Sequence, residues 1–125
     1  MGNTGEAAAY FSRWNGSEFT MPIRATPMDM EIFTASWAGP DIASYGDTIY
    51  IVFKENPEDI APAYCVHSYD GGISFSEPVQ VDGMIGDNIS RFPSVTVNEE
   101  GQPIVAFMKL DSDFGNARYV VTYFR

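Results

Sequence analysis

The sequence predicts an all-β protein built from small antiparallel sheets, and three features of the chain support this prediction. Short apolar runs rich in β-branched and aromatic residues recur at 49–53, 104–108 and 119–124, and such runs are typical of strands. Gly, Asp, Asn and Pro bound these runs and mark turns. No segment longer than ten residues has a convincing helical period. Because the apolar runs are continuous rather than alternating, we expect strands that are covered on both faces.

An internal repeat of about 55 residues organises these strands. Residues 8–23 align with 64–79 without a gap, and residues 46–54 align with 101–109. The complete unit is expected to contain four antiparallel strands, near 40–45, 48–54, 62–69 and 74–81. Four short strands repeated at this spacing are typical of the blades of a β-propeller. The sequence therefore predicts a repeat protein of the propeller type.

The repeat also predicts how the chain is divided among blades. We expect residues 1–37 to form strands three and four of one blade, 38–88 a complete blade, and 89–125 strands one to three of the next, about two blade equivalents in all. Hairpin turns are expected at 45–47 and 98–101, where a glycine supplies a positive φ. A closed propeller needs at least about four blades. We therefore expect the chain to be part of a longer protein, with self-association into a ring as the less favoured alternative.

Composition excludes several classes of function. The chain of 125 residues has 7 Lys and Arg against 17 Asp and Glu, a net charge of −10, which argues against a nucleic-acid partner or an anionic membrane surface. Cys65 is the single cysteine and His67 the single histidine, so neither an internal disulfide nor a structural zinc site is expected. No apolar run approaches the ~18 residues of a membrane span. We predict no cofactor and no bound metal.

One segment connects the chain to a known family. Residues 68–75, Ser-Tyr-Asp-Gly-Gly-Ile-Ser-Phe, resemble the Asp-box, Ser-x-Asp-x-Gly-x-Thr/Ser-Trp/Phe, which is also called the bacterial neuraminidase repeat. All five specified positions match: Ser68, Asp70, Gly72, Ser74 and Phe75. A degenerate copy at 12–19 keeps Ser12, Gly16 and Phe19 but has Trp14 and Glu18 at the other two positions. The chain thus resembles part of a sialidase-like propeller.

The residues of the box themselves predict a structural role. Ser68 and Asp70 oxygens are expected to bond backbone N–H groups of a tight turn, Gly72 to adopt a conformation closed to other residues, and Phe75 to pack beneath. The alternative is that Asp70 acts as a catalytic acid or a calcium ligand. The structural interpretation is favoured, because function resides in particular sites rather than in the motif that folds a blade.

The resemblance also implies what a sialidase site would need. Sialidases of this family use an arginine triad for the substrate carboxylate, a Tyr–Glu nucleophile pair and an Asp acid/base. Residues 90–97 resemble the Phe/Tyr-Arg-Ile-Pro motif of the first triad arginine, with Ser90 and Phe92 as departures. Arg91 is therefore the candidate substrate-binding residue. Alternatively, Arg91 bonds preceding carbonyl groups or an acidic neighbour such as Asp87. No other triad member and no catalytic residue is identifiable, so this chain alone is expected to be inactive.

Two further expectations concern a loop and the large side chains. The acidic loop 82–88 could bind calcium, but it lacks the ligand spacing of a known loop motif, so a flexible connection is the favoured interpretation. The methionines and tryptophans are expected to pack between blades rather than to form a binding surface. This expectation covers Met21, Met28, Met30, Met84, Met108, Trp14 and Trp37.

Three functions agree with these observations. The leading hypothesis is a non-catalytic segment of a secreted or cell-surface Asp-box propeller that binds a glycan or a protein. The alternative is a fragment of an exo-sialidase or related glycoside hydrolase in which Arg91 contacts the substrate carboxylate. The third is a scaffold with no ligand. The fold alone does not decide among them, because propellers carry many unrelated activities.

Overall fold

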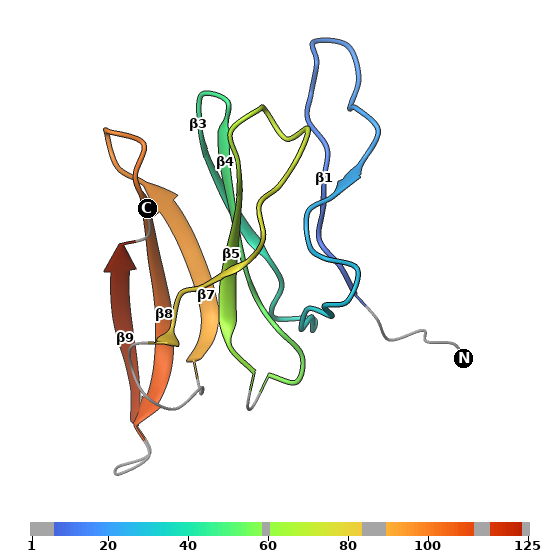
Figure 1. The fold of residues 1–125 in the computed structure, drawn as a ribbon. Coiled ribbons are helices and arrows are strands. Elements are labelled where there is room, and N and C mark those ends of the chain that lie inside the picture. The colour runs from blue at the N-terminus through green and yellow to red at the C-terminus, as the bar shows by residue number, and fades with distance from the viewer. Residues whose placement is uncertain (1–6, 59–60, 84–89, 112–115, 124–125) are drawn as a thin grey trace, which may run out of the picture.

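The computed structural model describes residues 7–58, 61–83, 90–111 and 116–123, and these residues contain nine strands and no α-helix. The prediction of an all-β protein is confirmed. Figure 1 shows the strands, which are β1 (Tyr10–Phe11), β2 (Ile23–Arg24), β3 (Asp41–Tyr45), β4 (Thr48–Lys54), β5 (Ala63–Ser68), β6 (Val79–Gln80), β7 (Ser90–Val97), β8 (Pro103–Asp111) and β9 (Asn116–Tyr123).

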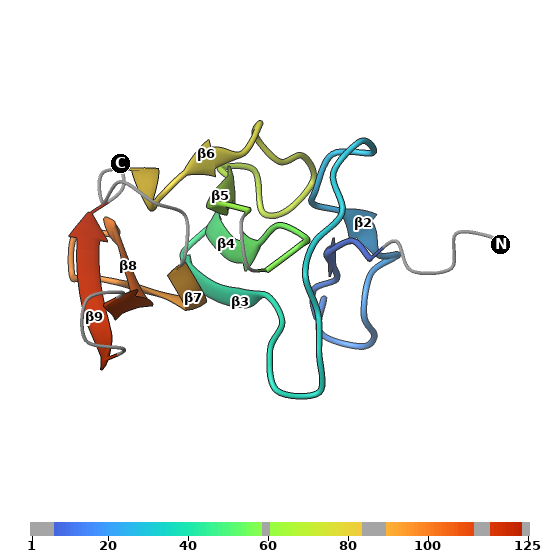
Figure 2. The same cartoon turned by 90° about the horizontal axis from the view of Figure 1, so that it is seen from below.

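The strands form three antiparallel sheets in which neighbours in sequence are neighbours in space. The sheets are β1-β2, β3-β4-β5-β6 and β7-β8-β9. Figures 1 and 2 show the four-stranded sheet in the middle, with the two-stranded sheet on one side and the three-stranded sheet on the other. We call these the central, first and third sheets. Strand β7 packs against β3 and β4 of the central sheet.

The third sheet covers one face of the central sheet. From β4, Tyr50 and Val52 face a cluster that includes Val105 and Phe107 of β8. Two polar contacts reinforce this packing: the Val95 amide donates to Asp41 Oδ2 at 3.0 Å, and the Tyr50 hydroxyl donates to the Gly101 carbonyl at 3.2 Å. Burying such side chains stabilises a fold by about 1.5–3 kcal/mol each.

The opposite face of the central sheet is covered from the N-terminal side. Here the alternate residues of β4, Ile49, Ile51 and Phe53, pack in a cluster with Ala9 and Ala25 beside the first sheet. Successive side chains of a strand point to opposite faces, so burial on both sides favours apolar residues at successive positions. The continuous apolar run of β4 therefore has the two-sided burial that the sequence predicts.

The two predicted hairpin turns are also confirmed. Gly46 joins β3 to β4 with a φ of 62°, and Gly101 precedes β8 with a φ of 82°. At Gly101 a second constraint acts, because an added Cβ would lie 2.6 Å from Cδ2 of Tyr45. Glycine is therefore needed there both for its backbone conformation and for the close approach of the central sheet.

The fourth strand of the central sheet is shorter than predicted. The expected strand at 74–81 is limited to Val79–Gln80, which pairs with Tyr64 and Cys65 of β5. The N–H groups of residues 73 and 74 bond the Asp70 side chain instead of a neighbouring strand, and Pro78 has no N–H to donate. Residues 73 and 74 therefore belong to the turn rather than to the fourth strand.

We expect Phe53→Ala to lower the free energy of unfolding by about 3–5 kcal/mol, because it opens a cavity in the cluster between the first and central sheets. Urea unfolding followed by fluorescence measures this loss. The control is Met21→Ala, which removes a side chain that is 83% exposed and should change stability by less than ~0.5 kcal/mol. Similar losses in the two variants would contradict the two-sided burial of β4.

Candidate functional site

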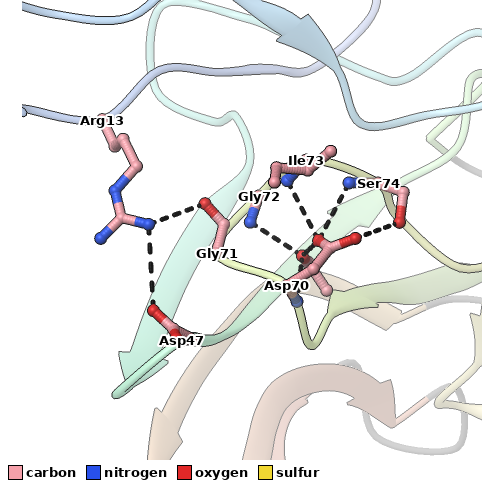
Figure 3. A network of polar contacts seen from close by, with 8 residues as sticks. Arg13, Asp47, Asp70, Gly71, Gly72, Ile73 and Ser74 are labelled. Atoms are coloured by element: carbon pink, nitrogen blue, oxygen red, sulfur yellow. Dashed lines mark hydrogen bonds and ion pairs between the residues drawn. The ribbon is translucent and has the colours of Figure 1, made fainter.

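The Asp70 carboxylate closes the turn between β5 and β6. Its Oδ1 accepts hydrogen bonds from the amides of Ile73 and Ser74, both at 3.0 Å, and from the Ser68 hydroxyl at 2.7 Å. Its Oδ2 accepts from the Ser74 hydroxyl at 2.6 Å. Figure 3 shows these bonds converging on the carboxylate. The motif therefore uses Asp70 to hold backbone N–H groups that no neighbouring strand takes.

The other box residues complete the turn and attach it to the first sheet. The Ser68 hydroxyl oxygen accepts from the Gly72 amide at 2.9 Å. Gly72 has a φ of +93°, and an added Cβ would lie 2.1 Å from Cε2 of Phe11. Phe75 packs edge-on against that same ring, with centroids 5.8 Å apart. Thus Gly72 allows, and Phe75 makes, a contact with β1 across the gap between sheets.

The electrostatics of Asp70 favour this structural role. Hydrogen bonds from the side chains of Ser74 and Ser68, and then from the Ser74 amide, hold the pKa of the carboxyl well below its usual range. A general acid must instead carry a proton near the working pH. The arrangement stabilises a permanent carboxylate and gives no support to Asp70 as a catalytic acid.

The degenerate copy of the box closes its turn with a different residue. Trp14 stands where the box has its aspartate, but the next residue, Asn15, supplies the acceptor. Asn15 Oδ1 accepts from the amides of Ser17 and Glu18, both at 3.0 Å. These are the equivalents, 56 positions earlier, of the two amides that Asp70 holds. The sequence comparison missed Asn15 because it assumed an acceptor at a fixed position.

Of the three box residues that the degenerate copy keeps, only one has the role expected of it. Gly16 has a φ of +107°, as the glycine of a tight turn requires. Ser12, however, donates from its hydroxyl to the Thr20 carbonyl at 2.6 Å rather than binding the turn. Phe19 is exposed and packs edge-on against Trp14, with centroids 5.4 Å apart. Only the intact box places its aromatic residue between sheets, as Phe75 does.

Arg13 links the two turns. Its Nη1 donates to the Gly71 carbonyl at 3.1 Å and lies 4.0 Å from Asp47 Oδ1. The Gly71 amide in turn donates to the Asp47 carbonyl at 2.9 Å. Figure 3 shows Arg13 reaching toward both Gly71 and Asp47. The intact box is therefore fixed to the β3-β4 hairpin and to the first sheet, which again describes a structural motif.

Arg91, the candidate substrate-binding arginine, forms an ion pair with Glu58. Both side chains are largely buried, with 19% and 14% of their surfaces exposed. An acidic partner is thus present, but it is Glu58 from another segment of the chain. Asp87, the partner considered from the sequence, lies outside the described residues. Glu58 therefore neutralises the charge of Arg91.

A bulge follows Arg91 and gives the next residue an unusual conformation. The pairing of β7 with β8 shifts register between Arg91 and Ser94, and Phe92 adopts a φ of +56°. A positive φ is strained for a bulky residue, and such strain often marks a functional position. The bulge leaves the Phe92 ring 43% exposed.

Phe92 borders a cavity of about 260 Å³ at the junction of the central and third sheets. The cavity is lined by aromatic, small and charged residues: Phe33, Trp37, Ala38, Gly39, Lys54, Glu58, Phe92, Pro93 and Ser94. Trp37 is 68% exposed. Two aromatic side chains with accessible surface therefore border a space that also contains polar groups.

Sequence reasoning missed this cavity because it assigned the large side chains to the interior. Within the described chain Trp14, Trp37, Met21 and Met28 are exposed rather than packed between its sheets, whereas Met30 packs against the cluster between the first and central sheets. Met84 lies outside the described residues. For Trp37 a signal was present, because the tryptophan precedes Ala38, Gly39 and Pro40, and such a segment is typical of a loop.

A buried polar network supports the floor of the cavity. Lys54, 3% exposed, donates from Nζ to the Ala61 carbonyl and to Ser90 Oγ. Ser90 donates to Asp82 Oδ2, which also accepts from the Ala63 amide at 3.1 Å. The network joins β4, β7 and the segment after β6. Asp82, the first acidic residue of the loop considered for calcium, is bonded inside the protein, and residues 84–88 lie outside the described part.

The Cys65 thiol is not a candidate nucleophile. Burial raises the pKa of the Cys65 thiol to about 12, so the thiol stays protonated and is a poor nucleophile at neutral pH. Across residues 7–58, 61–83 and 90–108, no group of three His, Cys, Asp or Glu side chains is placed to hold a metal ion. The described residues also contain no helix with the length and hydropathy of a membrane span.

Comparison with known proteins assigns neither a family nor a function to the chain. No protein-family model matches the chain, and no curated protein matches its sequence.

We expect Asp70→Asn to lower stability at neutral pH, because the amide loses the charge of the acceptor and places an NH₂ group beside Ser74. The depressed pKa of Asp70 contributes stability that is fully present above the ordinary pKa of 3.8. This stability is lost as the pH falls through the folded-state pKa. Wild type should therefore lose more stability than the variant below about pH 4.

Urea unfolding at neutral and acid pH measures both effects. Asp29→Asn, on an exposed loop, makes the same change of charge and should leave the acid-dependent loss intact. Equal unfolding midpoints for wild type and Asp70→Asn at both pH values would contradict the assigned role of Asp70.

Proposed function

We propose that this chain is part of a sialidase-like Asp-box β-propeller and that it binds a glycan in the cavity bordered by Trp37 and Phe92. Three features support the propeller. The central sheet has four antiparallel strands in sequence order, the intact box occupies the turn between its third and fourth strands, and further sheets flank it on both sides. These features support the interpretation of the central sheet as a blade between two neighbouring blades.

The observation that carries the binding function is the pairing of exposed aromatic rings with polar groups in one cavity. Sugar-sized ligands bind in clefts where apolar surface supplies contact area and a few polar groups fix orientation. Trp37 and Phe92 offer rings for the C–H faces of a pyranose. Glu58 and Ser94 line the same cavity and offer oxygen atoms to its hydroxyl groups.

The charges around the cavity favour a neutral glycan. Arg91 is paired with Glu58, and the Lys54 ammonium donates to protein oxygens. The net charge of the chain is −10, which repels anions at long range. We therefore infer that the site takes uncharged sugars. An extracellular or cell-surface location follows from this proposal, because that is where most glycans are presented.

The second candidate function is that of an exo-sialidase fragment, and one observation favours it. Arg91 lies next to the cavity, between Ser90 of the buried network and Phe92 of the lining. For Arg91 to bind a substrate carboxylate, however, Glu58 must first leave it. The glycan-binding proposal needs no such rearrangement and is therefore the better supported of the two.

We expect Trp37→Ala to weaken binding of a neutral oligosaccharide by about tenfold or more, as removal of a central aromatic contact does in other interfaces. A glycan array selects the ligand, and titration calorimetry measures its affinity. The matched control is Trp14→Ala, because Trp14 is also exposed but does not line the cavity. Equal losses in the two variants, or none in either, would contradict the proposed site.

The same titration separates the two candidate functions. A glycan-binding site predicts that wild type prefers a neutral oligosaccharide over its sialylated form, and that Glu58→Gln reduces this preference by removing the charge that neutralises Arg91. Tighter binding of the sialylated form by wild type, or its hydrolysis, would favour the exo-sialidase.

A further inference from the structure

Asn15 and Gly16 form an exposed Asn-Gly pair at the tip of the first turn. Three donors converge on one atom there. Asn15 Oδ1 accepts from the Ser17 amide at 3.0 Å, the Ser17 hydroxyl at 3.3 Å and the Glu18 amide at 3.0 Å. Gly16 has a φ of +107°, and nothing lies within 4 Å of the position of an added Cβ. The pair is therefore open to water and unobstructed.

We propose that Asn15 is a site of spontaneous covalent modification, at which the folded turn promotes formation of a cyclic imide. The Gly16 main-chain nitrogen attacks Asn15 Cγ and forms a new N–C bond. The bond from Cγ to the side-chain nitrogen breaks, and that nitrogen leaves as ammonia with the proton lost from Gly16. Water then opens the ring at either carbonyl and yields aspartate or isoaspartate. No oxidant, reductant or enzyme is required.

The hydrogen bonds of the turn act on the atom where charge develops. When nitrogen attacks Cγ, negative charge accumulates on Oδ1, and donors already aimed at that atom stabilise the transition state, as in an oxyanion hole. The bond from the Ser17 amide also folds the Asn15 side chain back over the intervening Gly16 peptide group, as in an Asx turn. The donors that shape the turn thus also favour its chemical modification.

The intact box shows what the aspartate product would do. Asp70 holds the two equivalent amides with a carboxylate oxygen, so aspartate at position 15 supplies a suitable acceptor and makes the net charge one unit more negative than −10. Isoaspartate adds a carbon to the main chain and moves the carboxylate away from the turn. We therefore expect the aspartate product to preserve the turn and isoaspartate to loosen it.

Incubation of the full chain at neutral pH, followed by peptide mapping with mass spectrometry, tests this proposal. Conversion should be found at Asn15 in the folded protein and should be faster there than in the same chain unfolded in urea. Ser17→Ala removes the hydroxyl donor, so it should slow conversion about fivefold in the folded protein and leave the rate in urea unchanged. Gly16→Ala should nearly abolish it in both states.

The ratio of folded to unfolded rates separates chemistry from simple exposure. If the folded protein converts more slowly than the unfolded chain, or if Ser17→Ala has the same small effect in both states, the three donors do not promote the reaction and the proposal is overturned. The unfolding midpoint of each variant confirms that the folded rates refer to folded protein. Asn15→Asp serves as the standard for the aspartate product and should unfold at the wild-type midpoint.

Discussion

The rest of the structure depends on the burial of β4 on both of its faces. Alternate residues of this strand belong to two different clusters, one shared with the third sheet and one shared with the first. Neither cluster is complete without β4, so the three sheets are held together through one strand. The central residues of this strand, 49–53, are all apolar, as burial on both faces favours, and the free energy of their burial is available only when both neighbouring sheets are in place.

Side-chain polar groups supply hydrogen-bond partners where the packing of the sheets leaves backbone N–H groups or buried polar groups without a strand partner. Where the chain leaves β5, the N–H groups of the turn have no strand to pair with, and Asp70 accepts them. Where the third sheet meets the central sheet, Lys54, Ser90 and Asp82 bond one another in the interior. Buried polar groups stabilise a fold only when their partners are present, and these networks therefore also fix the position of β7 beside the cavity.

The candidate binding site follows from the same geometry. Phe92, within the bulge after Arg91, and Trp37, in the segment before β3, both line the cavity. The ion pair of Arg91 with Glu58 sets the local charge close to zero. The form and charge of the candidate site are thus a consequence of how two sheets meet rather than of any one motif.

Much of the fold was predictable because its determinants are local. The apolar run of β4, the glycines of the two hairpins and the residues of the intact box can each be recognised from a few adjacent positions of the chain. The site was less predictable. The pairing of Arg91 with Glu58 joins segments distant in sequence, and the exposure of Trp37 depends on which sheets pack together. The turn acceptor of the degenerate box is Asn15 rather than residue 14, and a repeat alignment without gaps excludes this shift of one residue. The short β6 reflects competition between turn and strand for the same N–H groups.

Hydrogen exchange of the backbone amides, followed residue by residue by NMR, tests the central claim most directly. If β4 holds the three sheets together, its amides at 49–53 should exchange only through global unfolding and be the slowest measured, with those of β1 and β2 opening at lower free energy. Exchange of the β4 amides as fast as those of β1 would show that the two clusters do not depend on this strand, and would contradict the account.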